Sequence, residues 1–236
     1  MKKFSFLVLS VYLMMISCTK REDTEKEIQK DLLIKQVSDI VNLNVVQSNP
    51  DDFMMMNCNN PYDQAGIITS KITYEVLSKA RDNKSDPNML RSEFINTVSS
   101  TLSASNLSLD TVDYNDVEFI IENFLIDIYV KEGFSVFVIK SKEIENIVNK
   151  SPFFNIDQKK RVLMFSSMLR HNINMIQVFF IENSISKSGP WSDCFFDKLR
   201  ELEDCRNCWV ERIFCITSWP TCLGVKALDC AIDAIF

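Results

Sequence analysis

Residues Asp157–Phe180, DQKKRVLMFSSMLRHNINMIQVFF, have the sequence pattern of a long helix. Beyond its charged first turn, apolar side chains fall on more than one side of a helix with 3.6 residues per turn. A helix that is apolar around most of its circumference has to be covered by other elements. The stretch therefore predicts a long central helix buried by its neighbours, in a mainly α protein.

Weaker helical patterns precede this stretch. Apolar rows predict helices that begin near Ile28, Asp63, Pro87, Val117 and Ile144. Asp63 and Asp86 are expected to cap the second and third of these. Residues 135–139 are predicted to form a short strand or one turn of helix, and Pro152 is expected to end the short helix that follows. With the central helix, these patterns predict a bundle of about six helices over residues 28–183.

The composition limits the class of protein. Four glycines are too few for a many-stranded barrel or for a glycine-rich phosphate loop. The single histidine, His171, cannot form a multi-histidine metal site and is expected to be structural. The net charge of −6 provides no basic surface for nucleic acid. We therefore expect no cofactor, no metal and no nucleic-acid partner.

The carboxylates and motifs of the chain do not indicate catalysis. Glu118 and Glu122 are four residues apart, but a di-iron bundle needs paired Glu-x-x-His units. They are expected to lie on a solvated helix face. No GxSxG or HExxH motif is present. The sequence therefore predicts a protein that is not an enzyme.

The chain starts with the features of an export signal. Met1-Lys2-Lys3 is basic, and the thirteen residues Phe4–Ile16 carry no charge. A membrane-spanning helix needs about 20 apolar residues, so this run is too short to cross a bilayer. It fits the hydrophobic region of a secretory signal peptide, which is removed from the mature protein.

The residues Met15-Ile16-Ser17-Cys18 resemble the lipobox of bacterial lipoproteins. The resemblance implies that Cys18 becomes the first residue, carries acyl chains such as palmitate, and anchors the protein to the outer membrane. Several chains on one cysteine hold a protein far better than one chain does. Thr19–Asp23 is similar to a surface-export signal of some lipoproteins, and a solvated linker of mixed charge explains it equally well. The resemblance therefore predicts that the protein is attached to a membrane through its N-terminal lipid.

Removal of residues 1–17 takes away two lysines and no acid, so the net charge of the mature chain is −8. An anionic membrane surface repels such a body, and the lipid has to make the attachment. The expected division of the chain is a signal peptide (1–17), a lipidated tether (18–27), a helical bundle (28–183), a linker (184–189) and a cysteine-rich helical hairpin (190–236).

The cysteine-rich end contains six of the eight cysteines, between residues 194 and 230. In an exported protein such cysteines form disulfides more often than they bind metal. Two helices that meet at the Trp219-Pro220 break would bring together residues whose numbers have a constant sum. The sequence therefore predicts a hairpin stapled by Cys208–Cys230 and Cys215–Cys222.

The remaining cysteines are harder to pair. On one continuous helix Cys194 and Cys205 would lie about 16 Å apart, whereas a disulfide needs Cα atoms within about 7 Å. We expect Cys58–Cys194 to pin the hairpin to the bundle, with Cys205 unpaired or joined to another molecule. A redox CxxC at Cys205–Cys208 would need a neighbouring βαβ unit, and a zinc site fits the compartment less well than disulfides do.

Two functions fit these features. The first is a binding or structural lipoprotein whose C-terminal module contacts a protein or envelope component. The second is the precursor of an antibacterial toxin, cut after Lys187, or near Arg81 or Lys84, whose residues 188–236 act on competing bacteria. The released part would be acidic, whereas membrane-lytic peptides are usually cationic, which favours the first function.

Overall fold

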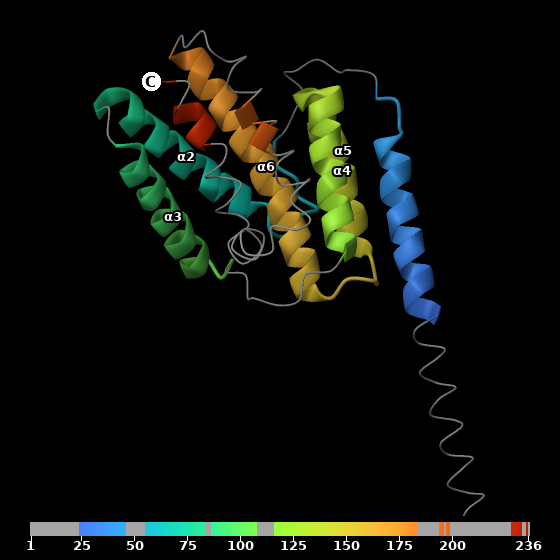
Figure 1. Cartoon of the computed structure of the whole chain (residues 1–236). Helices are drawn as coiled ribbons and strands as arrows, with labels where there is room; N and C mark the ends of the chain where they lie inside the picture. Colours follow the sequence, from blue (N-terminus) through green and yellow to red (C-terminus); the bar gives the residue numbers. More distant parts are fainter. Residues whose placement is uncertain are drawn as a thin grey trace, which may run out of the picture.

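The computed structural model describes residues 24–45, 55–83, 86–107, 116–183, 194–195, 197–198, 228–232 and 235. Within these ranges every regular element is a helix, which confirms the predicted mainly α class (Figure 1). The six longer helices are an N-terminal helix (residues 24–41), α2 (Gln64–Asn83), α3 (Pro87–Ala104), α4 (Asp116–Glu132), α5 (Phe134–Lys150) and α6 (Ile156–Glu182).

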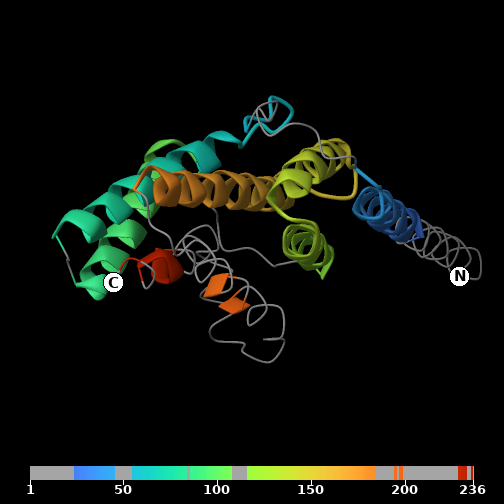
Figure 2. The ribbon, with the colours of Figure 1, turned by 90° about the horizontal axis from the view of Figure 1, so that it is seen from above.

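The central helix is α6, as its sequence predicts. All thirteen residues from 161 to 173 are buried, so every side of the helix is covered over more than three turns. The helices α2, α4 and α5 pack around it. Figure 2 shows α6 between α2 on one side and the pair α4 and α5 on the other. The N-terminal helix lies at the outer edge of this arrangement, next to α5.

The start of α3 is set by the residues that the sequence indicates. Asp86 caps α3 by accepting a hydrogen bond from the amide of Asn88 at 3.0 Å, and Pro87 is the first helical residue. Gly133, with φ of 83°, separates α4 from α5. This left-handed backbone strongly favours glycine.

The prediction of a strand or single turn at residues 135–139 is wrong, because α5 is one continuous helix from Phe134 to Lys150. Its apolar start packs on α4, where the rings of Phe137 and Tyr129 lie 5.7 Å apart. The weak alternation in the sequence thus reflects a helix buried on more than one side, since tertiary packing overrides local propensity.

The N-terminal helix begins at residue 24, inside the segment expected to be a tether. Its first turns contain Glu25, Lys26 and Glu27, which are good helix formers although they are not apolar. Lys30 also forms an ion pair with Glu27 at 3.1 Å, one turn away. Apolar spacing, on which the predicted boundary at residue 28 depends, does not detect such a start.

Helices α2 and α6 run in the same direction and approach each other closely. Gly66 faces Ser167, and one to two turns further on Thr73 donates a hydrogen bond to Asn172 Oδ1 at 2.6 Å. A Cβ at Gly66 would lie 2.4 Å from the Ser167 hydroxyl and 2.5 Å from its carbonyl oxygen. The glycine therefore allows the two backbones to meet.

We expect Gly66→Ala to lower the free energy of unfolding by about 2 kcal/mol, because the Ser167 carbonyl belongs to the backbone and cannot rotate away. Denaturant unfolding followed by circular dichroism measures this change. Glu75→Ala, at an exposed position of the same helix, is the matched control and should change stability by less than about 0.5 kcal/mol. Equal stability of Gly66→Ala and the unchanged chain would contradict the close approach.

Candidate functional site

A cluster of buried charged side chains lies where α5 and α6 meet the segment before α2. We call Asp63, Glu145, Arg170 and His171 the Arg170 cluster. Arg170 has no exposed surface, and its guanidinium donates hydrogen bonds to carboxylate oxygens of both Asp63 and Glu145. Its Nε donates to the carbonyl oxygen of Met55 at 2.9 Å. Burial of a charge is tolerated only with such charged and hydrogen-bonding partners.

Asp63 joins this cluster through both of its carboxylate oxygens. Oδ1 accepts from Arg170, while Oδ2 accepts the backbone N–H of Asn57 at 3.0 Å and lies 3.3 Å from His171 Nε2. Burial by itself would raise the pKa of this carboxyl, but the hydrogen bond to His171, the charge of Arg170 and the Asn57 amide together lower it to about 2. The expectation that Asp63 caps α2 is wrong, because its carboxylate turns towards α6 instead.

Glu145 is held in the same way from α5. Its Oε1 accepts from Arg170 and its Oε2 accepts from the side-chain amide of Asn57 at 2.6 Å. All members of the Arg170 cluster are buried. His171 is buried and bonded to Asp63, as expected of a structural histidine. A charged residue within an apolar helix needs buried partners, and this is the sequence signal that identifies Arg170 as a member of the cluster.

A second buried ion pair overturns one prediction. Arg161 of α6 donates through Nε and Nη2 to the two carboxylate oxygens of Glu118 in α4, both at 2.8 Å. Glu118 and Glu122 are almost fully buried, so the predicted solvated face is wrong. The prediction failed because α6 supplies a cation at that position, and a paired carboxylate can be buried between helices.

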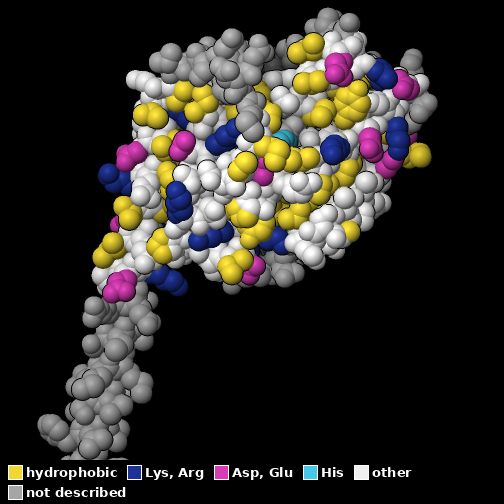
Figure 3. Space-filling model, turned by 180° about the vertical axis from the view of Figure 1, so that it is seen from behind, with side chains coloured by type: hydrophobic (Ala, Val, Ile, Leu, Met, Phe, Trp, Pro, Cys, Tyr) yellow, Lys and Arg dark blue, Asp and Glu magenta, His cyan; other side chains and the backbone are white. Residues whose placement is uncertain are grey.

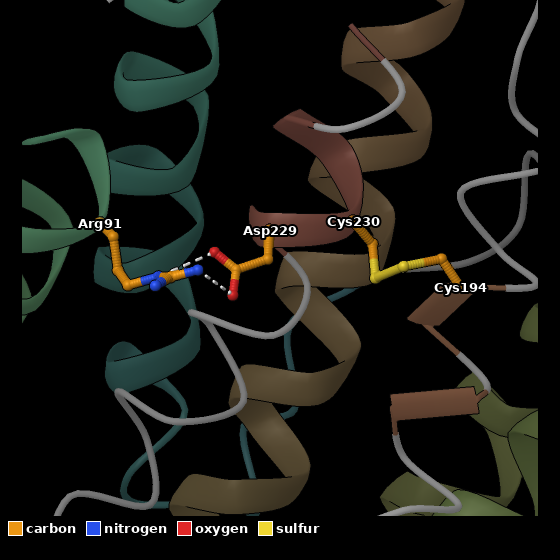
Figure 4. Close-up of a disulfide and its surroundings, with 4 residues drawn as sticks. All are labelled: Arg91, Cys194, Asp229 and Cys230. Atoms are coloured by element: carbon orange, nitrogen blue, oxygen red, sulfur yellow. Dashed lines mark hydrogen bonds and ion pairs between the residues drawn. A yellow bond between two sulfur atoms is a disulfide. The ribbon is translucent and has the colours of Figure 1, made fainter. Parts of the chain in front are cut away.

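The disulfide in the described part of the chain joins Cys194 to Cys230, with Cα atoms 5.7 Å apart (Figure 4). Both residues were predicted to be disulfide-bonded, but the predicted pairs Cys208–Cys230 and Cys58–Cys194 are wrong. The constant-sum rule assumes two straight helices that meet at one turn. The pairing instead brings the two ends of the cysteine-rich segment together, so that rule does not apply to it.

The residues beside this disulfide attach it to the bundle. Next to Cys230, Asp229 forms two hydrogen bonds with Arg91 of α3, at 3.0 Å and 2.8 Å between nitrogen and oxygen (Figure 4). Next to Cys194, the ring of Phe195 is buried 6.4 Å from that of Tyr129 in α4. We call residues 194–195, 197–198, 228–232 and 235 the C-terminal anchor. In Figure 2 it lies on one side of α6, between α3 and α4.

The other predicted site residues are not brought together. Cys58, expected to bond to Cys194, is exposed and free. Arg81, proposed as a cleavage site in a polar break, lies in the last turn of α2, and its guanidinium is 5.8 Å from the ring centre of Phe179. The predictions for Cys18, Lys84, Lys187, Cys208, Cys215 and Cys222 concern residues outside the described ranges.

Clefts of about 320, 340 and 360 Å³ lie on the described surface. No member of the Arg170 cluster lines any of these three clefts. On the face seen in Figure 3, hydrophobic and charged side chains are interleaved rather than gathered into one large patch. Among the described residues, no three His, Cys, Asp or Glu side chains are arranged to hold a metal ion. The buried charges accordingly fit a structural role better than a chemical one.

No protein-family model matches the chain, and comparison with curated proteins and with solved structures finds no similar protein. No helix within the described ranges has both the length and the apolar character needed to cross a membrane. The function has therefore to be argued from the residues themselves.

Replacing Arg170 by Met should lower the free energy of unfolding by about 3–5 kcal/mol, because it leaves two carboxylates buried without their cation. Arg91→Met is the matched control, since the Arg91–Asp229 pair is partly exposed and such pairs contribute about 1 kcal/mol or less. Chemical denaturation of both variants measures the difference. Similar losses for the two would show that the Arg170 cluster does not support the fold.

Stability should fall in acid as Asp63 is protonated. Since the pKa of Asp63 in the folded state lies below its ordinary value of 3.8, its contribution is present above about pH 4 and is lost as the pH falls towards 2. The lowering to about 2 corresponds to about 2 kcal/mol. Urea unfolding at several pH values should show this loss in the unchanged chain but not in Asp63→Asn. Parallel curves for the two proteins would refute the assignment.

Proposed function

We propose that this chain is a lipid-anchored, non-enzymatic protein of the bacterial cell envelope whose C-terminal segment binds a protein or an envelope component. The observation that carries the proposal is the sequence Met15-Ile16-Ser17-Cys18, which overlaps the end of the uncharged region Phe4–Ile16. A hydrophobic region of that length followed by a small residue and a cysteine is the pattern of an acylated precursor. Export also accounts for the use of cysteines as disulfides.

The character of the helical body supports a binding or structural role. The Arg170 cluster and the Arg161–Glu118 pair use their charges to hold helices together, and they lie away from the described clefts. A rigid bundle that stabilises itself in this way is suited to hold a binding segment at a membrane.

The C-terminal segment is proposed as the binding part because both of its ends are fixed to the bundle. The Cys194–Cys230 disulfide closes a loop with a sequence separation of 36 residues. In the chain-entropy model such a cross-link stabilises the folded state by about 4 kcal/mol. Closing the loop beside α3 and α4 reduces the conformational entropy that a partner would otherwise have to remove on binding.

The toxin hypothesis gains one argument and loses another. Because Cys58 is free, a cut after Lys187 would leave no disulfide between that cysteine and the released part. However, Leu228, Ala231 and Ile232 are buried in the core, and Asp229 is bound to Arg91. Release would require separation of these contacts, so we prefer the binding function.

The acylation test uses the full chain expressed in a bacterium supplied with an alkyne-tagged fatty acid. We expect the tag on the unchanged protein and on Cys58→Ser, and none on Cys18→Ser, which should also leave the membrane fraction. The Cys58→Ser control shows that the label reports Cys18 rather than the exposed free thiol. Tagging of Cys18→Ser, or an unlabelled wild-type protein, would overturn the lipoprotein proposal.

The binding part of the proposal is tested separately, by crosslinking in intact cells followed by purification under denaturing conditions. A partner crosslinked by the unchanged chain should be reduced with Cys194→Ser/Cys230→Ser, while Glu75→Ala, at an exposed position outside the C-terminal anchor, serves for comparison. The toxin alternative would be favoured if trypsin-treated protein killed related bacteria and no crosslinked partner were found.

A further inference from the structure

The end of the bundle closest to Cys18 is the start of the N-terminal helix. Five residues, 19–23, separate Cys18 from residue 24, where the helix begins. Even a fully extended chain spans at most about 3.5 Å per residue, so the helix starts within about 20 Å of the cysteine. If Cys18 is acylated, as the proposed function states, this end of the protein is held at the membrane surface.

The first turns of this helix expose two large aliphatic side chains. Ile28 and Leu32 are 61% and 55% exposed and lie one turn apart on the same side. The helix packs on the body through Leu33 and Val37, which are buried. Nine residues separate Ile28 from Val37, which is two and a half turns at about 100° per residue, so the two point in opposite directions. The exposed pair is therefore not part of the core-facing stripe.

The far end of the same helix is fixed to the body. The carbonyl oxygen of Val41, its last residue, accepts a hydrogen bond from Lys140 Nζ of α5 at 2.6 Å. The same ammonium donates to both carboxylate oxygens of Glu132 in α4 at 2.8 Å. Because these contacts lie at the end remote from Cys18, they hold the helix without covering Ile28 or Leu32.

A third exposed aliphatic residue lies at the same end of the molecule. Ile156, the first residue of α6, is 74% exposed. Residues close to it in the chain lie near the start of the N-terminal helix, since one cleft is lined by Lys26 and Lys30 together with Asn155 and Gln158. Figure 1 shows the start of α6 and the start of the N-terminal helix at the same, lower end of the bundle.

Charge at this end is balanced although the mature chain is acidic. Residues 24–32 contain two lysines and three acids. The adjoining ends of α5 and α6 add three lysines, Lys150, Lys159 and Lys160, and one acid, Asp157. Figure 3 likewise shows acidic and basic side chains side by side at the lower end of the described surface. An anionic headgroup layer would therefore not repel this end as it would repel the body as a whole.

We infer that residues 24–32 of the N-terminal helix, with Ile28 and Leu32, insert into the interface of the bilayer that holds the lipid anchor. The occupant of this face is the lipid surface, because the short distance to Cys18 brings it there. Interfacial helices bury an apolar side to a depth of about 5–10 Å in the headgroup region. The contact would fix the orientation of the bundle on the membrane and hold the C-terminal anchor away from it.

The test measures the depth of single positions in the full, acylated chain. Ile28→Trp and Asp39→Trp are each reconstituted into phosphatidylethanolamine–phosphatidylglycerol vesicles, with and without brominated acyl chains that quench tryptophan. The emission of the unchanged chain is subtracted, since it contains three tryptophans of its own. Asp39 is the matched position, because it lies on the same side of the helix as Ile28 and about 16 Å further along the helix from Cys18.

We expect the brominated lipids to reduce the emission of Ile28→Trp by about twofold and to leave that of Asp39→Trp nearly unchanged. Both positions are exposed, so both variants should fold, and circular dichroism checks this. Quenching of Ile28→Trp no stronger than that of Asp39→Trp would overturn the inference.

Three further outcomes separate this inference from its alternatives. If the protein carries no acyl chain and does not float with vesicles, the proposed function fails, and the inference with it. If it floats but Ile28→Trp is not quenched, only the inference fails. If acrylamide does not quench Ile28→Trp in detergent, and dilution of the protein restores the quenching, a second copy of the chain covers this face. The inferred membrane contact is then wrong.

Discussion

The burial of the Arg170 guanidinium is the constraint on which the arrangement of helices depends. A cation with no exposed surface has to be surrounded by acceptors, and here these come from α5, from Asp63 and from the Met55 carbonyl. Apolar contacts alone tolerate some sliding between helices. The planar fork of an arginine accepts its partners in few positions, so it also fixes the register of α6 against its neighbours. Gly66 then permits the close approach of α2 that this register requires.

The two ends of the chain are attached to this bundle in different ways. At the N-terminal side one helix is held at its far end by Lys140, while its first turns expose Ile28 and Leu32. At the C-terminal side the disulfide, the Arg91–Asp229 pair and Phe195 hold the segment at several points. In the proposed function, the first end belongs to the membrane and the second to a partner. The rigid bundle between these two ends sets the distance between the membrane and the bound partner.

The sequence predicts the helices much better than it predicts the contacts between them. The apolar circumference of Asp157–Phe180 and the Asp86-Pro87 start are local signals, and the structure agrees with both. The partners of Arg170 and the partner of Glu118 lie on other helices, and no local pattern identifies them. The predicted cysteine pairs are wrong for the same reason. The constant sum of residue numbers assumes an ideal hairpin, whereas the path of the intervening chain determines which sulfurs meet. The start at residue 24 was missed since charged helix formers leave no apolar period.

The buried arginine also determines the order in which the chain can fold. Arg170 is 25 residues from Glu145 but 107 residues from Asp63. When the chain is synthesised from its N-terminus, Asp63 therefore emerges long before Arg170, the cation with which it pairs. The segment before α2 cannot reach its final position until α6 has followed, and contacts between such distant residues form slowly. The polar centre thus delays completion of the fold until most of the bundle has emerged.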